Sequence, residues 1–238
     1  MNFLAHSVVL PTDSTDLTRV GSALPDLWPL MSPRPLPALV LRELEAGRDP
    51  RCAELRHGIA HHMQADSVFH SHPDFESRVD WLSRQLRTRW PDLRHASTYA
   101  HVLVEMLLDR WLMERDVRPL DIYYQAFQPQ NLAFAAEHAV LDPGVSPALL
   151  AVLERFATLQ FLRGYTTAKG FTQRFLGVTR RLPWPWEWAP SSHDELINNI
   201  DPWHRHLTPR SDELIESVRA AVEARMGRHQ PPAGRGPA

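Results

Sequence analysis

Residues 58–73 read GIAHHMQADSVFHSHP. If this stretch is helical, His62, Asp66 and His70 lie four positions apart and form one stripe, because such residues are neighbours on a helix surface. Imidazole and carboxylate groups are ligands that divalent metal ions accept. The stretch therefore predicts a helix from about Pro50 to His70 that carries a row of candidate metal ligands.

A second row with the same spacing follows at His101, Glu105 and Asp109. The residues between them are almost all apolar: Val102, Leu103, Val104, Met106, Leu107 and Leu108. Charged groups that face an apolar core are costly unless they are paired, hydrogen-bonded or bound to a metal. Two such rows brought face to face would form a metal site between helices.

The composition fits an ordinary globular protein. The chain has 238 residues, 43% of them apolar, and a formal net charge of -2, which gives no strong attraction to nucleic acid or anionic lipid. Its single cysteine, Cys52, excludes a disulfide within the chain and a cysteine-based zinc site. The first residues lack the basic segment of a signal peptide, and no long apolar run would span a membrane. We expect a cytoplasmic protein with no nucleic-acid or membrane partner.

Helical periodicity runs through most of the chain, and no segment alternates with the period of a strand. The pattern predicts an all-α fold, a single-domain bundle of about eight to ten helices over residues 1–227, followed by a disordered tail at 228–238. The clearest predicted helices cover 37–46, 50–70, 74–90, 96–114, 119–141, 147–165, 167–181, 194–206 and 211–227, and the 119–141 helix has a possible break at Pro129. Pro25 and Pro29 are expected to prevent a long helix over residues 21–30.

The candidate ligands combine histidines and acids from several segments. They are His6, Asp26, His62, Asp66, His70, Glu105 and Asp109, with His61 as an alternate. Mixed nitrogen and oxygen ligands suit Mn, Mg, Fe or Zn. Such an ion would polarise a phosphoryl oxygen and lower the pKa of a bound water. Asp66 and His70 are the candidates for catalytic proton transfer.

Structural roles are open for the same residues. His61, His62 and Asp66 could lie on a solvated helix face, and His70 could stabilise the C-terminal end of its helix. The two acids of the second row could form ion pairs with other helices. His101 fits a core or surface position as well as a site.

Two further features have alternative explanations. The segment 183–190, which contains Trp184, Trp186 and Trp188, could pack against the core or line a pocket or a partner surface. The basic residues of the later helices could bind phosphate or form a solvated face; they are Lys169, Arg174, Arg180 and Arg181.

Three motifs resemble those of the acyl carrier protein phosphodiesterase family. The chain begins Met-Asn-Phe-Leu-Ala-His6, and Gly-x-x-x-His-x-x-x-Asp follows from Gly58 to Asp66. The third motif is an acid-x-x-x-Asp-x-x-Leu pattern from Glu105 to Leu112. The similarity extends over most of the chain, and the N-terminal half carries the specific motifs.

The resemblance implies an all-helical fold similar to the HD-domain metal-dependent phosphohydrolases. It also implies a phosphodiesterase that removes the phosphopantetheine arm from holo acyl carrier protein, with a divalent metal, typically Mn or Mg. By the motif match, the implied metal-site residues are His6, Asp26, His62, Asp66 and Asp109. The chain departs from the family pattern at His70, where an acid is usual, and at Glu105, where the usual acid is Asp.

The residues leave two other functions open. One is a non-catalytic helical scaffold or binding protein with a structural metal or an internal ion-pair network. The other is a zinc-dependent phospholipase-like enzyme, which would need more histidine ligands and a surface for membranes. An open coordination position would favour catalysis, whereas a closed shell would favour a structural metal.

Overall fold

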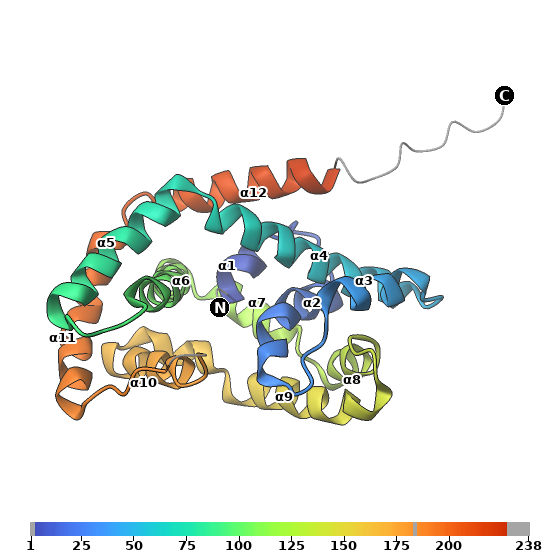
Figure 1. The fold of residues 1–238 in the computed structure, drawn as a ribbon. Coiled ribbons are helices and arrows are strands. Elements are labelled where there is room, and N and C mark those ends of the chain that lie inside the picture. Colours follow the sequence, from blue (N-terminus) through green and yellow to red (C-terminus); the bar gives the residue numbers. More distant parts are fainter. Residues whose placement is uncertain (1–2, 183–184, 228–238) are drawn as a thin grey trace.

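The computed structural model describes residues 3–182 and 185–227, and within these ranges the chain is all-α with no strand (Figure 1). The α-helices are α1 (Phe3–Val8), α2 (Asp16–Leu27), α3 (Pro37–Ala46), α4 (Pro50–His70), α5 (Pro73–Arg89), α6 (Ala96–Arg115), α7 (Arg118–Gln125), α8 (Pro129–His138), α9 (Ser146–Leu159), α10 (Ala168–Thr179), α11 (Pro190–Leu207) and α12 (Ser211–Gly227). Three 3-10 segments join them: η1 (Trp28–Leu30), η2 (Pro143–Val145) and η3 (Phe161–Thr166).

The number of α-helices in the described ranges exceeds the expected eight to ten. The difference arises at α1, at α2, and at Pro129, which divides the predicted 119–141 helix into α7 and α8. A proline is favourable at the first position of a helix, so Pro129 starts a new helix instead of bending an old one. The predicted tail at 228–238 lies outside the described residues.

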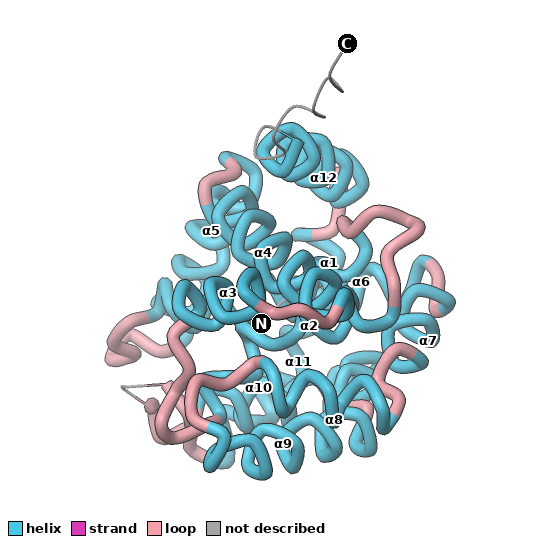
Figure 2. The backbone as a smooth tube through the Cα atoms, turned by 90° about the vertical axis from the view of Figure 1, so that its right-hand side faces the viewer, coloured by secondary structure: helices cyan, strands magenta, loops and turns pink. Residues whose placement is uncertain are grey.

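The helices are arranged around α1 and α6. In Figure 1, α4 and α12 run along one side of the molecule and contact each other, while α8, α9 and α10 lie on the opposite side. Figure 2, from a perpendicular direction, again places α1 and α2 between α12 and the α8–α10 side. The short N-terminal helix is therefore enclosed by its neighbours, which explains why Leu4, Ala5 and His6 are buried.

Helices α2 and α4 cross with their backbones in contact. A Cβ atom on Gly58 would overlap the carbonyl oxygen of Thr18, and one on Gly21 would lie 2.5 Å from the carbonyl oxygen of Leu55. Only glycine permits such an approach at both positions. The crossing places the next turn of α4, with His62, against the second half of α2.

The expectation that proline would prevent a long helix over residues 21–30 is wrong at Pro25, whereas the α-helix does end before Pro29. Helix α2 runs through Pro25 to Leu27, and η1 follows directly. Pro25 removes one backbone donor, but it lies in the last turn, where the cost is one hydrogen bond. The apolar face of α2, including Val20 and Leu24, is fully buried and offsets this cost.

Local signals set the ends of the central helix as predicted. Asp49 accepts a hydrogen bond from the amide of Arg51, and Pro50 follows as the first residue of α4. His72 likewise accepts from the amide of Asp74 where α5 begins. None of the described helices combines the length and the apolar character that a bilayer crossing needs.

The aromatic segment before α11 packs against the core. The ring of Trp188 lies 5.2 Å from Trp90, 5.7 Å from Tyr99 and 5.8 Å from Phe175, measured between ring centroids. Trp186 is also partly buried against this core, whereas Trp184 lies outside the described residues. The packing interpretation therefore holds for Trp188 and Trp186.

Candidate metal centre

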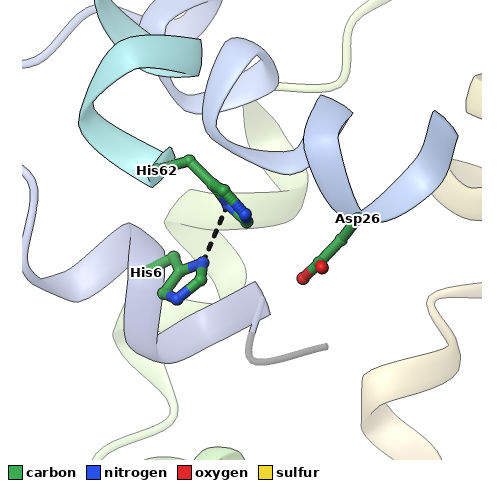
Figure 3. Close-up of side chains that lie close together, drawn as sticks. All are labelled: His6, Asp26 and His62. Carbon is green, nitrogen blue, oxygen red and sulfur yellow. Dashed lines mark hydrogen bonds between the residues drawn. The ribbon is translucent and has the colours of Figure 1, made fainter. Parts of the chain in front are cut away.

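Three helices bring His6, Asp26 and His62 together, and we call these residues the first group (Figure 3). One ligand atom from each side chain lies within 4.8 Å of the others. His6 comes from α1, Asp26 from α2 and His62 from α4, and both imidazoles are buried. These are three of the residues that the sequence predicts as metal ligands.

The ring of His62 is oriented by the backbone of α2. Its Nδ1 atom lies 2.7 Å from the carbonyl oxygen of Ser22 and 2.8 Å from Nδ1 of His6. A carbonyl oxygen can only accept, so Nδ1 of His62 carries the proton in this contact. The Nε2 atom of His62 then keeps the lone pair that a metal ligand requires. Nδ1 of His6 faces the same proton as an acceptor.

Burial favours the neutral form of His6. Removal from water, followed by the nearby charge of His62, holds the pKa of His6 well below its usual value. A neutral imidazole is the form that binds a metal ion, and no proton must be displaced from a charged ring first. Because Nδ1 of His6 then holds the only lone pair of the neutral ring, a metal ion bound by His6 would replace its contact with His62.

A second group forms where α4 faces α6, from His70, His101 and Glu105. The Oε1 atom of Glu105 lies 3.3 Å from Nε2 of each histidine, and the two Nε2 atoms lie 2.9 Å apart. Asp66 adds a carboxylate oxygen 3.4 Å from Nε2 of His70. Four side chains that could bind a cation therefore face one another.

The charges of the second group support one another. Burial alone would raise the pKa of Glu105, but the hydrogen bonds from His101 and His70 contribute to holding it well below its usual value. Burial works against the charge on His70, yet the hydrogen bond to Glu105 and the charge of Asp66 raise its pKa. Burial raises the pKa of Asp66 itself. The group therefore holds a proton on His70 that faces two carboxylates.

The two groups are neighbours along α4. His62, Asp66 and His70 occupy successive turns, as the sequence predicts, and Asp66 lies between the groups. Its pKa responds to His70 and His62, one from each group, and that of His6 responds to Glu105. One electrostatic site therefore extends over both groups.

Asp109 and His61 belong to neither group. The Oδ1 atom of Asp109 accepts a hydrogen bond of 2.9 Å from the amide of Ala5, so this carboxyl group holds the start of α1. Burial raises the pKa of Asp109 to about 8, and its Oδ2 atom has no hydrogen-bond partner among the described residues. His61 is buried on another face of α4, where burial lowers its pKa to about 4.

The sequence left His101 open between a site residue and a core or surface residue and did not place it among the candidate ligands, whereas the structure places it in the second group. The available signal was its position, one helical turn before Glu105 in an otherwise apolar helix. A histidine next to a candidate acidic ligand is a candidate for the same ion. The partly buried position of its ring agrees with that interpretation.

One family model matches the chain. A family model described as acyl carrier protein phosphodiesterase matches residues 1–214, a range that includes both groups. Neither the curated proteins nor the solved structures contain a match to the chain.

Proposed function

The chain belongs to the acyl carrier protein phosphodiesterase family, and from this premise we propose that its two histidine–carboxylate groups bind the divalent metal used in catalysis. Membership implies a phosphoric diester hydrolase that acts on the phosphopantetheine of acyl carrier protein. The observation that supports a metal is the convergence of His6, Asp26 and His62 from three different helices. Mixed nitrogen and oxygen donors fit Mn, Mg, Fe or Zn.

The proposed ligand set extends the first group. Asp66 lies next to it on α4 and would supply a further carboxylate oxygen. Asp109 would use its Oδ2 atom, because Oδ1 is already engaged by the amide of Ala5. Glu105, His70 and His101 would form a second cation position next to the first. His61 is the least suited of the predicted ligands, because it lies outside both groups.

A bound divalent ion would polarise the phosphoryl oxygen and supply an activated water. The chain's own residues would then manage the protons. Attack by water forms a new bond to phosphorus, the phosphodiester bond breaks, and the leaving oxygen needs a proton. When the metal occupies the first group alone, Nε2 of His70 keeps its proton and is suited to donate it, because its pKa is raised. Asp66, 3.4 Å away, is suited to accept a proton from the water.

We also propose that the helices form a single HD-domain-like domain. Ligands that come from separate helices of an all-α core are consistent with the predicted HD-domain-like arrangement in one domain over residues 1–227. The alternative is a scaffold in which the second group is only an internal ion-pair network. That alternative is supported by the contacts of Glu105, whose Oε1 atom lies 3.3 Å from Nε2 of both histidines, within ion-pair distance.

Metal analysis and a hydrolysis assay distinguish the two possibilities. Protein freed of metal by chelation is titrated with Mn²⁺, and release of phosphopantetheine from holo acyl carrier protein is measured. We expect activity only with metal, and a loss of at least about 100-fold in His62→Ala. His57→Ala is the matched control, because His57 is an exposed histidine on the same helix. No activity under either condition, together with no response of the unfolding temperature to any divalent ion, would support the scaffold. Equal activity with and without Mn²⁺ would exclude a catalytic metal.

A further inference from the structure

Asp26 of the first group also borders a cavity of about 580 Å³ on the opposite side of α2 from α4. The cavity lies between the end of α2 and the elements α9, η3 and α10. A volume of this size is in the range that holds a small organic ligand. The candidate metal centre is therefore connected to a binding cavity through a shared residue.

Three arginines line the cavity: Arg155 on α9, Arg174 on α10 and Arg181 just after α10. Among the described residues, no carboxylate lies within ion-pair distance of any of them. Arg163, on the neighbouring η3, is by contrast paired with Asp121 at 2.6 Å. Among the residues that line the cavity, these three guanidinium groups outnumber the one carboxylate, that of Asp26, and give the cavity an excess of positive charge. Guanidinium groups bind phosphate oxygens by paired hydrogen bonds.

Apart from Gln173, the rest of the wall is apolar. Phe3, Phe156 and Phe161 form an aromatic cluster with ring centroids 5.0–5.6 Å apart. Leu30 and Leu159 extend the wall outward, and they are 40% and 51% exposed. These two side chains offer apolar surface at the mouth of the cavity that a bound ligand would cover. The cavity thus combines a phosphate-binding charge with a lining for an uncharged chain.

We propose that this cavity binds the phosphopantetheine arm of the substrate, with the phosphate near Asp26 and the arginines and the pantetheine chain along the aromatic wall. The inference rests on the proposed function for the identity of the ligand. The charge and the apolar lining of the cavity, and its contact with Asp26, are properties of the chain and do not require a bound metal ion. Arg174 and Arg181 therefore act in phosphate binding, whereas the exposed Lys169 and Arg180 do not border the cavity.

Two types of variant test the cavity. In the first, Arg174→Gln and Arg181→Gln are combined, with Arg180→Gln as the control at the neighbouring position. In the second, Gly177→Leu fills the cavity: Gly177 borders it, and a Cβ atom there would meet nothing within 4 Å. Gly227→Leu, at an equally open position in α12, is the steric control.

For both cavity variants we expect KM for holo acyl carrier protein to rise about tenfold or more, with kcat changed much less, because charge-assisted hydrogen bonds or ligand volume are lost. Both controls should retain the wild-type KM. The Mn²⁺-dependent rise of the unfolding temperature should be unchanged in all four proteins. Unchanged KM in both cavity variants would overturn the proposal.

A binding experiment separates this proposal from the proposed function. Free 4′-phosphopantetheine is titrated calorimetrically into wild type and variants in EDTA, where catalysis is not required. We expect binding to wild type, weaker binding to both cavity variants, and much weaker binding of inorganic phosphate, which lacks the chain. Equal binding of phosphopantetheine to wild type and variants would overturn the proposal even if metal-dependent hydrolysis is found. A higher KM for the holo protein with unchanged binding of the free arm would assign the arginines to the protein surface of the partner, and would also overturn it.

Discussion

Nε2 of His70 lies 2.9 Å from Nε2 of His101, although the two residues are 31 positions apart on different helices. Without a cation, this contact needs a proton between the two nitrogens. Oε1 of Glu105 lies 3.3 Å from each nitrogen, and its negative charge stabilises that proton. A divalent ion would take the place of the proton. Protonation and metal binding are therefore expected to compete at this position.

His101→Ala tests whether the second group contributes to metal affinity. The variant loses one of the three facing ligand atoms, and each tenfold loss of affinity removes about 1.4 kcal/mol of Mn²⁺-dependent stabilisation. We expect a smaller rise of the unfolding temperature with Mn²⁺ than in wild type or in the control His57→Ala. Identical rises in all three proteins would restrict the metal to the first group.

Gly58→Ala is expected to damage both the fold and the site. The added methyl group would overlap the carbonyl oxygen of Thr18, and its Cβ would lie 2.9 Å from the amide of Ser22. Helices α2 and α4 must then separate, at a cost of about 1–3 kcal/mol for overpacking. The measurement is urea unfolding, with Gly177→Ala as the matched control. That substitution is in a helix with open space around it and should be neutral or stabilise by up to about 1 kcal/mol. Equal stability of the two variants would contradict backbone contact at the crossing.

Asp109→Asn should change how stability depends on pH in metal-free protein. Burial raises the folded pKa of Asp109 to about 8 from a usual value of 3.8, so between these values only the folded chain keeps the proton. The stabilisation from this proton is complete below pH 4 and is lost as pH rises toward 8, by at most about 1.4 kcal/mol per pH unit. Asn cannot titrate but can still accept from the amide of Ala5.

The Asp109→Asn variant should therefore gain stability relative to wild type as the pH increases from 5 to 8. Unfolding by urea in EDTA at each pH measures the difference. Parallel stability profiles would show that Asp109 has an ordinary pKa in the folded chain. With Mn²⁺ present, a loss of the metal-dependent stabilisation in the variant would identify Asp109 as a ligand.

His61→Leu tests the alternate ligand with the opposite sign of pH dependence. Burial lowers the folded pKa of His61 to about 4 from 6.5, so the unfolded chain takes up a proton first as pH falls. Wild type loses stability between pH 6.5 and 4 by at most about 1.4 kcal/mol per unit, and the variant should not show this part of the loss. The Mn²⁺-dependent rise of the unfolding temperature should match wild type. A reduced rise in His61→Leu would show that His61 binds the metal after all.

The helices were predictable wherever a local signal marks their ends. The predictions for residues 37–46, 50–70 and 211–227 are confirmed, because Pro37, Pro50 and Ser211 start these helices. A short helix that starts near Ser14 or Asp16 was expected, but its continuation through Pro25 was missed, because burial against α4 outweighs the cost of the proline. Local propensity carries no information about such a tertiary contact.

The site residues on α4 were predictable from the sequence, whereas those on the other helices were predictable only in part. Spacing of four identifies His62, Asp66 and His70 as one stripe, since the helix geometry alone determines it. Spacing cannot tell which face of α6 meets that stripe. His101 and Glu105 face His70, whereas Asp109 is one turn further on and contacts the start of α1. The difference depends on the crossing of three helices, which no single helix encodes.

The glycine crossing of α2 and α4 also limits how the site can adapt. Where Gly21 and Gly58 meet, the separation of the helices is set by backbone radii, and no rotamer change can alter it. The crossing therefore fixes the distance between the two helices that carry Asp26 and His62. His6 lies outside this crossing, on a buried helix of only six residues that is held to α6 by the hydrogen bond from the amide of Ala5 to Asp109. If cations of different radius bind, we expect α1 to be displaced, because the separation of the other two ligand-bearing helices is fixed.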